Sequence, residues 1–70
     1  MKPVSGKRFC KILEQHGWIL KRTTKSSHFI FVKPGLPTTL SVPVHGNLDL
    51  KVGMQATLMK QAGLRESDLQ

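Results

Sequence analysis

The spacing of apolar residues along the 70-residue chain changes from helical to extended and back to helical, and this order constrains the fold most strongly. A helical stripe at i, i+3, i+4 and i+7 occupies the first segment: Phe9, Ile12, Leu13 and His16. Ser5 is a good N-cap for this helix and Gly17 a natural stop. A second helix is predicted over residues 54–62, where every fourth residue is apolar and Gly63 follows: Met54, Leu58 and Ala62.

Three short extended segments lie between the predicted helices, over residues 18–23, 28–33 and 38–43. Residues 33–36 join the second to the third and place Pro34 and Gly35 where a type II turn requires them. Such short connections favour an antiparallel meander. A loop is predicted over residues 44–53, and residues 64–70 either form one more helical turn or fray. The sequence predicts a single domain over residues 1–70 with an α+β fold of order α-β-β-β-α. Two helices pack on one face of its three-stranded antiparallel sheet.

A sheet covered by helices on one side should alternate in side-chain character. The more uniformly apolar set is predicted to face the helices: Trp18, Leu20, Phe29, Phe31, Leu40 and Val42. The opposite, open face then carries the remaining set: Ile19, Lys21, His28, Ile30, Thr39 and Ser41. Arg22 alternates with Lys21 and is expected on the side of Leu20, and a register slip of one residue would exchange the two sets. The two exposed isoleucines either form a docking surface or simply cover the sheet.

The charge balance points to a polyanionic partner, because eleven Lys and Arg oppose four Asp and Glu for a net charge of +7. The outer side of the first helix is itself basic, with Lys7, Arg8 and Lys11. One cysteine, Cys10, excludes an internal disulfide and a zinc site of the usual kind, and it suggests a reducing compartment. The longest apolar run, residues 29–32, is far too short to span a bilayer, and no signal peptide is evident. A cytoplasmic protein is therefore expected.

Several segments together resemble the HicA toxins of bacterial toxin–antitoxin systems, small mRNA interferases with a double-stranded-RNA-binding-like fold. The most informative is residues 25–31, Lys-Ser-Ser-His-Phe-Ile-Phe, which matches the family's Gly-Ser-His motif except that Ser26 stands in place of the glycine. If that position requires a positive φ, serine would be strained there. The other matching segments are residues 4–7, 13–18, 42–47, 50–53 and 58–64.

The resemblance implies a toxin that cleaves mRNA without a metal or other cofactor, with His28 as general acid or base. Histidine suits proton transfer near neutral pH because its reference pKa is about 6.5. The cations nearest in sequence are expected to hold phosphate, together with one before the second helix: Lys21, Arg22, Lys25 and Lys51. The resemblance also implies a HicB-type antitoxin that covers the active face. The free chain is expected to be monomeric.

Other residues admit more ordinary roles. His16 is expected to stabilise the end of the first helix, and Cys10 to be an unreactive side chain at the edge of the core. His45 either assists the chemistry or hydrogen-bonds its loop. The main alternative function is a non-catalytic double-stranded-RNA-binding module, although such modules concentrate lysines at the start of their second helix and residues 53–63 hold only Lys60. A helix-turn-helix DNA binder is excluded because three strands separate the helices.

Overall fold

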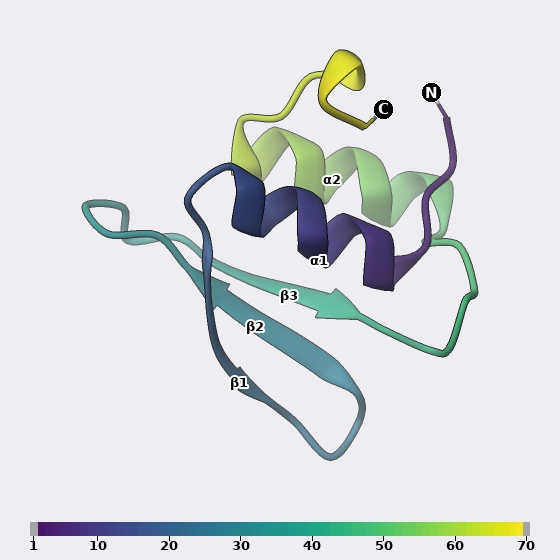
Figure 1. Cartoon of the computed structure of the whole chain (residues 1–70), viewed down its shortest axis with the longest axis horizontal. Helices are drawn as coiled ribbons and strands as arrows, with labels where there is room; N and C mark the ends of the chain where they lie inside the picture. Colours follow the sequence, from purple (N-terminus) through teal and green to yellow (C-terminus); the bar gives the residue numbers. More distant parts are fainter. Residues whose placement is uncertain (1, 70) are drawn as a thin grey trace.

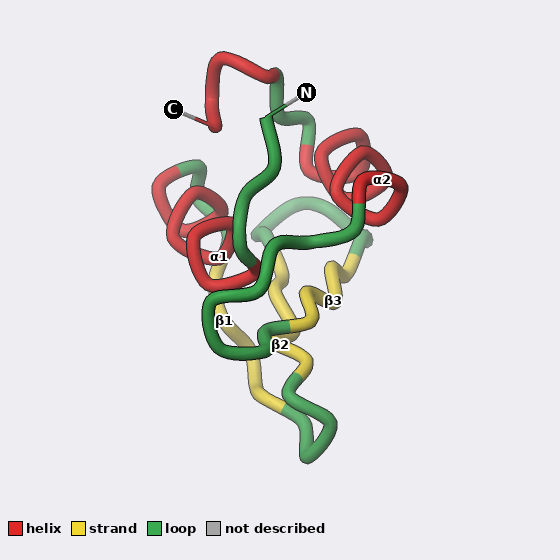
Figure 2. The backbone as a smooth tube through the Cα atoms, turned by 90° about the vertical axis from the view of Figure 1, so that its right-hand side faces the viewer, coloured by secondary structure: helices red, strands yellow, loops and turns green. Residues whose placement is uncertain are grey.

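The computed structural model describes residues 2–69 and contains the predicted elements in the predicted order (Figure 1). Their bounds are α1 Gly6–Gln15, β1 Ile19–Thr23, β2 His28–Val32, β3 Thr39–Pro43, α2 Val52–Ala62 and a closing 3₁₀ turn, η1, Glu66–Leu69. The sheet is antiparallel with strand order β1-β2-β3. Figure 2 shows both helices on one side of it, α1 towards the β1 edge and α2 towards the β3 edge. The predicted α+β architecture is confirmed. Within residues 2–69 neither helix has the length and apolarity needed to cross a membrane.

The core lies between the two helices and the sheet. The apolar stripe of α1 supplies Phe9, Ile12 and Leu13, all fully buried. The sheet supplies the rest of the innermost group from its covered face: Phe31, Leu40 and Val42, with Trp18 just before β1. The predicted cap of α1 is present, because the Ser5 hydroxyl accepts a hydrogen bond from the Arg8 backbone N–H at 3.0 Å.

The pairing of β2 with β3 agrees with the predicted faces. Phe29 lies opposite Val42 and Phe31 opposite Leu40, so all four point towards the helices. The alternate pairs occupy the open face: His28 with Pro43, Ile30 with Ser41, and Val32 with Thr39. The connection between the strands is the predicted type II turn, in which the Leu36 N–H donates to the Lys33 carbonyl and Gly35 has φ 86°.

The first strand departs from simple alternation because it contains a β-bulge. Leu20 lies opposite Phe31 and Arg22 opposite Ile30, so Lys21 is an extra residue between two consecutive pairs. The bulge reverses the facing of every later residue of β1. The prediction that Arg22 shares a face with Leu20 is therefore wrong: Arg22 lies on the open face of the sheet.

Leu20 itself does not join the core as predicted. Its register does place it on the covered face, but it is 40% exposed. The reason is that it lines an open cleft between α1 and the strands.

The second helix begins two residues earlier than predicted, at Val52, and buries only part of the predicted stripe. Met54 is 43% exposed, whereas Gln55, Leu58 and Met59 are buried. Gln55 is buried because its side-chain amide hydrogen-bonds to the N-terminal segment. Oε1 accepts from the Val4 N–H at 3.1 Å, and Nε2 donates to the Lys2 carbonyl at 2.6 Å. Apolar periodicity alone could not reveal this polar anchor.

The N-terminal segment is also tied to the loop before α2. The Leu50 N–H donates to the Val4 carbonyl at 2.8 Å, and Ser5 forms an isolated bridge with Asp49. At the opposite end of the chain, Leu69 in η1 is only 3% exposed. Of the two outcomes predicted for residues 64–70, the helical turn is the one seen over Glu66–Leu69, and Gln70 lies outside the described residues.

Candidate functional site

The candidate site begins at the turn between β1 and β2. The Thr24 N–H donates to the His28 carbonyl at 2.9 Å, and the Ser27 N–H donates to the Thr24 carbonyl at 3.1 Å. Ser27 adopts φ 63°, the left-handed conformation that closes this kind of hairpin after a tight turn. In addition, the Thr24 hydroxyl accepts from the His28 N–H at 3.2 Å. The backbone of His28 is thus fixed by the turn that precedes it.

The substitution at the motif's first position costs no strain in this backbone. The only non-glycine residue with a positive φ among residues 2–69 is Ser27, so Ser26 has an ordinary conformation that serine readily adopts. The strained position falls on the motif's serine instead. Ser27 also anchors the turn to the chain after β3, since its carbonyl accepts from the Val44 N–H at 2.9 Å.

His28 stands at the start of β2 on the open face, beside Pro43 of the neighbouring strand. The residue is partly buried rather than enclosed. Within residues 2–69 no hydrogen bond or ion pair engages its imidazole. This is the arrangement expected of a histidine that transfers protons to and from a bound substrate.

The bulge in β1 brings one cation to the same face. Arg22 pairs with Ile30, the next open-face residue along β2 from His28, and its side chain is exposed. Lys25 is exposed at the turn, three residues before His28. Lys21 is exposed too, but as the bulge residue it has no cross-strand partner. The structure thus favours Arg22 over Lys21 as the β1 cation nearest the imidazole.

Lys51 reaches the neighbourhood of His28 from the other side. It precedes α2 as the N-cap residue and lines a small hollow of about 260 Å³ together with His45 and Pro43. Pro43, which lines the hollow, is also the cross-strand partner of His28. His45 is exposed, and no hydrogen bond engages its imidazole within residues 2–69; only its backbone carbonyl is used, by the Leu48 N–H.

The remaining histidine and the cysteine lie away from this face. Nδ1–H of His16 donates to the Ile12 carbonyl at 2.8 Å, and Nε2 lies 3.3 Å from an Asp68 carboxylate oxygen, which supports a structural role. The pKa of Asp68 is lowered, first by the Arg65 backbone N–H and then by His16. Burial, with a smaller effect of Glu14, raises the pKa of Cys10 to about 11, which supports an unreactive thiol.

The comparison with known families gives a match over residues 6–64 to the HicA toxin of bacterial toxin–antitoxin systems. The chain belongs to the HicA toxin family. The match includes the turn, His28, Arg22, the hollow with Lys51, and both helices, and it confirms the resemblance seen in the sequence. Membership makes the chain a toxin of a toxin–antitoxin system and implies an antitoxin as its partner. No curated protein matched the chain.

The sequence did not reveal which cation would face His28, because the bulge has no reliable sequence signal. It also missed the hollow that joins Lys51 and His45 to Pro43. The position of His45 near the site could be inferred once the strand register was known, because His45 lies two residues after Pro43, the residue that pairs with His28.

Proposed function

We propose that this HicA-family toxin is a metal-independent endoribonuclease that cleaves mRNA, with His28 as its general acid or base. The observation that carries the proposal is the position of the imidazole, unpaired on the open face of the sheet with its backbone held by the turn. Exposed cations lie on β1, in the turn and at the start of α2: Arg22, Lys25 and Lys51. A polyanion lying along this face would place a phosphate between them.

The chemistry needs only groups that the chain and the RNA supply. The 2′-hydroxyl attacks the adjacent phosphorus, forming the O2′–P bond while the P–O5′ bond breaks, to leave a 2′,3′-cyclic phosphate and a 5′-hydroxyl. One group must take the 2′-hydroxyl proton and another must protonate the departing O5′. Arg22, Lys25 and Lys51 would stabilise the charge that develops on the phosphorane oxygens.

His28 performs one of the two proton transfers, and His45 is the best-placed candidate for the other. Its imidazole has no internal hydrogen bond within residues 2–69, and it shares a hollow with Lys51 beside the partner of His28. Since one general acid or base contributes roughly 10²–10⁴-fold, loss of His28 should have the larger effect if His45 only assists.

The substrate is an RNA with a free 2′-hydroxyl, and in the cell we expect it to be mRNA in the cytoplasm. The open face also carries apolar surface, with Ile19 53% exposed beside the cations. We expect an antitoxin of the HicB type to cover this face and exclude RNA from His28.

The test compares purified wild type with His28→Ala on a single-stranded RNA, in buffer containing a chelator. Wild type should cleave, and His28→Ala should be slower by about 10²–10⁴-fold. His45→Ala is the matched histidine variant and should lose less activity. The same RNA with a 2′-deoxy residue at the cleaved position should resist wild type, because its nucleophile is missing. Equal cleavage by wild type and His28→Ala would refute the role of His28.

The alternative of a non-catalytic RNA-binding module predicts a different result. Both proteins would then bind duplex RNA with equal affinity, and neither would cleave. The α2 face gives this alternative little support, because Lys60 is the only cation within Val52–Ala62 and Lys51 lies at its start.

A further inference from the structure

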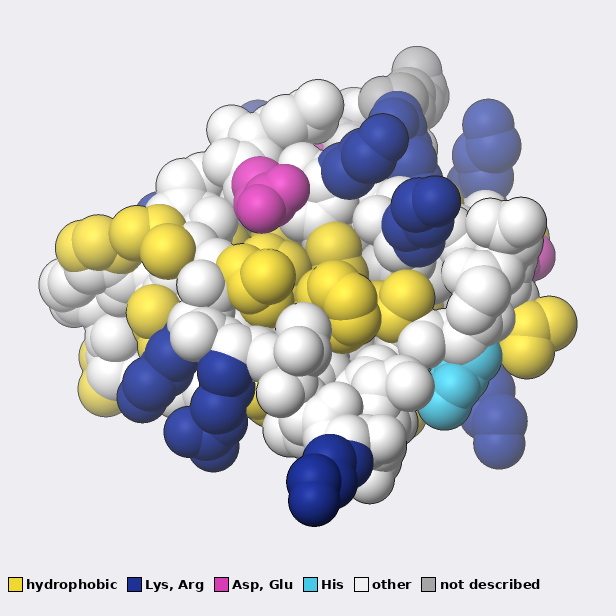
Figure 3. Space-filling view, turned by 60° about the horizontal axis from the view of Figure 1, so that its bottom comes forward, with side chains coloured by type: hydrophobic (Ala, Val, Ile, Leu, Met, Phe, Trp, Pro, Cys, Tyr) yellow, Lys and Arg dark blue, Asp and Glu magenta, His cyan; other side chains and the backbone are white. Residues whose placement is uncertain are grey.

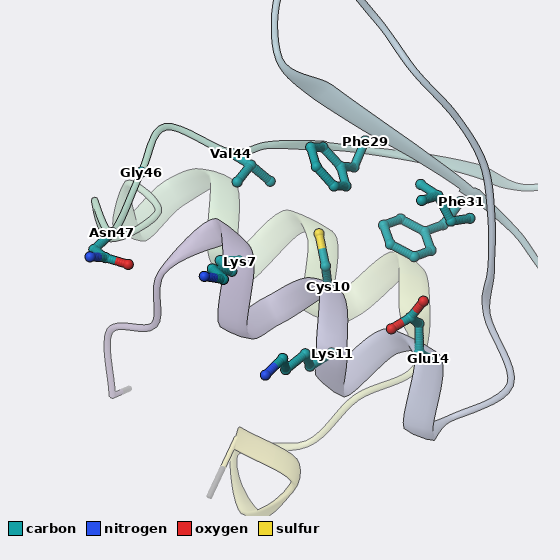
Figure 4. Close-up of a pocket in the computed structure, with 10 residues that line it drawn as sticks. Lys7, Cys10, Lys11, Glu14, Phe29, Phe31, Val44, Gly46 and Asn47 are labelled. Carbon is teal, nitrogen blue, oxygen red and sulfur yellow. The ribbon is translucent and has the colours of Figure 1, made fainter.

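A cleft on the helix-covered side of the sheet, opposite the face that carries His28, has no part in the proposed catalysis. It has a volume of about 560 Å³ and opens between α1 and the β1–β2 hairpin. Figure 4 shows Cys10 on α1 and the rings of Phe29 and Phe31 turned into the space between helix and sheet. Leu20 completes the apolar lining from β1. The tip of the β1–β2 hairpin points away from α1 (Figure 2).

Two apolar side chains of the cleft remain accessible to solvent. Leu20 is 40% exposed although its register directs it towards the helices, and Phe29 is only partly buried. The surface view shows a continuous patch of hydrophobic side chains with lysine and arginine side chains on both sides of it (Figure 3). A contiguous apolar patch rimmed by charge is typical of an interaction site.

The cleft adjoins an unpaired strand edge. β1 is the outer strand of the sheet, and within residues 2–69 no backbone hydrogen bond joins Ile19–Thr23 to anything on its outer side. A strand added at this edge would send every second side chain into the cleft beside Leu20 and the others onto the open face beside Arg22.

The charges at the cleft and the edge are mostly positive. Lys7 and Lys11 line the rim on α1, while Lys21 and Arg22 lie along β1; Glu14 is the only acidic residue among those that line the cleft. A second copy of this chain would bring like charges together at the same edge, which is a common device against self-pairing. An acidic strand would instead neutralise them.

We propose that β1 and the adjoining cleft form a docking site for an extended segment of a partner protein in which apolar and acidic residues alternate. The segment pairs with β1 as a fourth strand. Its apolar side chains fill the cleft over Leu20 and Phe29, and its acidic side chains meet Arg22 on the open face. Main-chain hydrogen bonds supply affinity and the alternating side chains supply specificity.

The antitoxin implied by the family is the natural source of such a segment, and to that extent the proposal rests on the toxin assignment. It is independent of the catalytic role of His28, since the segment pairs with β1 and meets Leu20 and Arg22 rather than the imidazole. A failure of RNA cleavage would leave peptide binding untouched, so the two proposals fail separately.

The experiment titrates the whole chain, labelled for NMR, with a capped nine-residue peptide in which valine alternates with glutamate. Amide shifts should map to Ile19–Thr23, Phe29 and the α1 residues of the cleft, and amide exchange along β1 should slow. Leu20→Lys should weaken binding by about tenfold or more, because it removes an apolar contact and places a charge in the cleft. Leu36→Lys is its control, since Leu36 is also half exposed but lies in the β2–β3 turn.

Charge and pairing are tested separately. Arg22→Glu should weaken binding several-fold, because the acidic side chains of the segment meet Arg22 on the open face, whereas Lys60→Glu, an exposed change of the same charge on α2, should not. A peptide with lysine in place of glutamate, or with N-methyl groups on alternate amides, should not bind. The proposal is overturned if Leu20→Lys binds as wild type does. It is also overturned if an oligonucleotide, rather than the peptide, shifts the cleft amides, or if sedimentation shows that a second copy occupies the edge.

Discussion

The buried amide of Gln55 gives the sharpest test of how this small fold is held together. Gln55 is 1% exposed and links α2 to the N-terminal segment through the Val4 N–H and the Lys2 carbonyl. Gln55→Leu keeps the approximate volume of the side chain but removes both hydrogen bonds. The loss matters mainly at Val4, which is 6% exposed, so its N–H cannot hydrogen-bond to water instead. Lys2 is exposed, and its carbonyl can accept a hydrogen bond from water.

The expected cost follows from that difference. A buried donor left without its acceptor costs roughly 1–3 kcal/mol, and a carbonyl that water can reach costs little. Additional burial of apolar surface by leucine offsets part of this. We therefore expect Gln55→Leu to lower the free energy of unfolding by about 1–2 kcal/mol. In a domain of this size that corresponds to a fall in Tm of roughly 5–15 °C.

Gln55→Glu adds a dependence on pH. A protonated glutamic acid can still donate to the Lys2 carbonyl, but a buried carboxylate cannot, so the folded-state pKa should rise above its usual value of about 4.3. A raised folded pKa means that stability is present below the usual pKa and is lost as the pH rises through the folded value. The stability of Gln55→Glu should thus be close to that of wild type in acid and lower than that of Gln55→Leu at neutral pH.

The assay is urea unfolding followed by Trp18 fluorescence, with hydrogen exchange at the Val4 amide. Gln61→Leu is the control, because Gln61 is exposed on the same helix. The reasoning is refuted if Gln55→Leu unfolds at the same urea concentration as wild type with the same slope, or if Val4 exchange is unchanged.

Three further predictions concern the backbone and the C-terminal turn. Ser27→Val should cost about 1–2 kcal/mol in urea unfolding because Ser27 has a positive φ, whereas Ser26→Val should change stability by less than about 0.5 kcal/mol. Gly6→Ala should cost about 2 kcal/mol or more, since its Cβ would meet a backbone carbonyl of β3, while Gly53→Ala, with nothing nearby, should stabilise by up to about 1 kcal/mol. The pKa of Asp68 lies below its ordinary value of 3.8, so its contribution to stability is present above that value and is lost as the pH falls through the folded pKa. In thermal melts Asp68→Asn should be less stable than wild type at pH 7, and the difference should shrink as the pH is lowered.

The sequence predicted most of the fold because local signals agreed with one another. The stripe of α1, the Ser5 cap and the Pro34-Gly35 turn each specify one local conformation, and the short connections leave few ways to pair the strands. The faces of β2 and β3 followed from simple alternation. In each of these cases the residue that carries the sequence pattern also forms the cap, turn or core contact that the pattern predicts.

The errors arose where a contact depends on residues far apart in the chain. Gln55 is buried because it bonds to Val4, 51 residues away, and no local pattern favours an inward glutamine. Leu20 is apolar and faces the helices, but it borders an open cleft and stays 40% exposed. In both cases burial was set by the packing of distant segments rather than by the character of the side chain.

The bulge at Lys21 connects the two surfaces proposed for this molecule. By reversing the strand it turns Arg22 towards the His28 face while leaving Leu20 directed into the cleft. A partner strand paired with β1 would therefore touch both faces at once, with apolar side chains in the cleft and acidic ones beside Arg22. Because Arg22 is a cation that we expect to hold phosphate, such a strand would compete with RNA without having to cover the imidazole. The partner would then bind mainly through Leu20 and would inhibit the toxin by blocking Arg22. Leu20→Lys should therefore leave the toxin active but poorly inhibited by its partner.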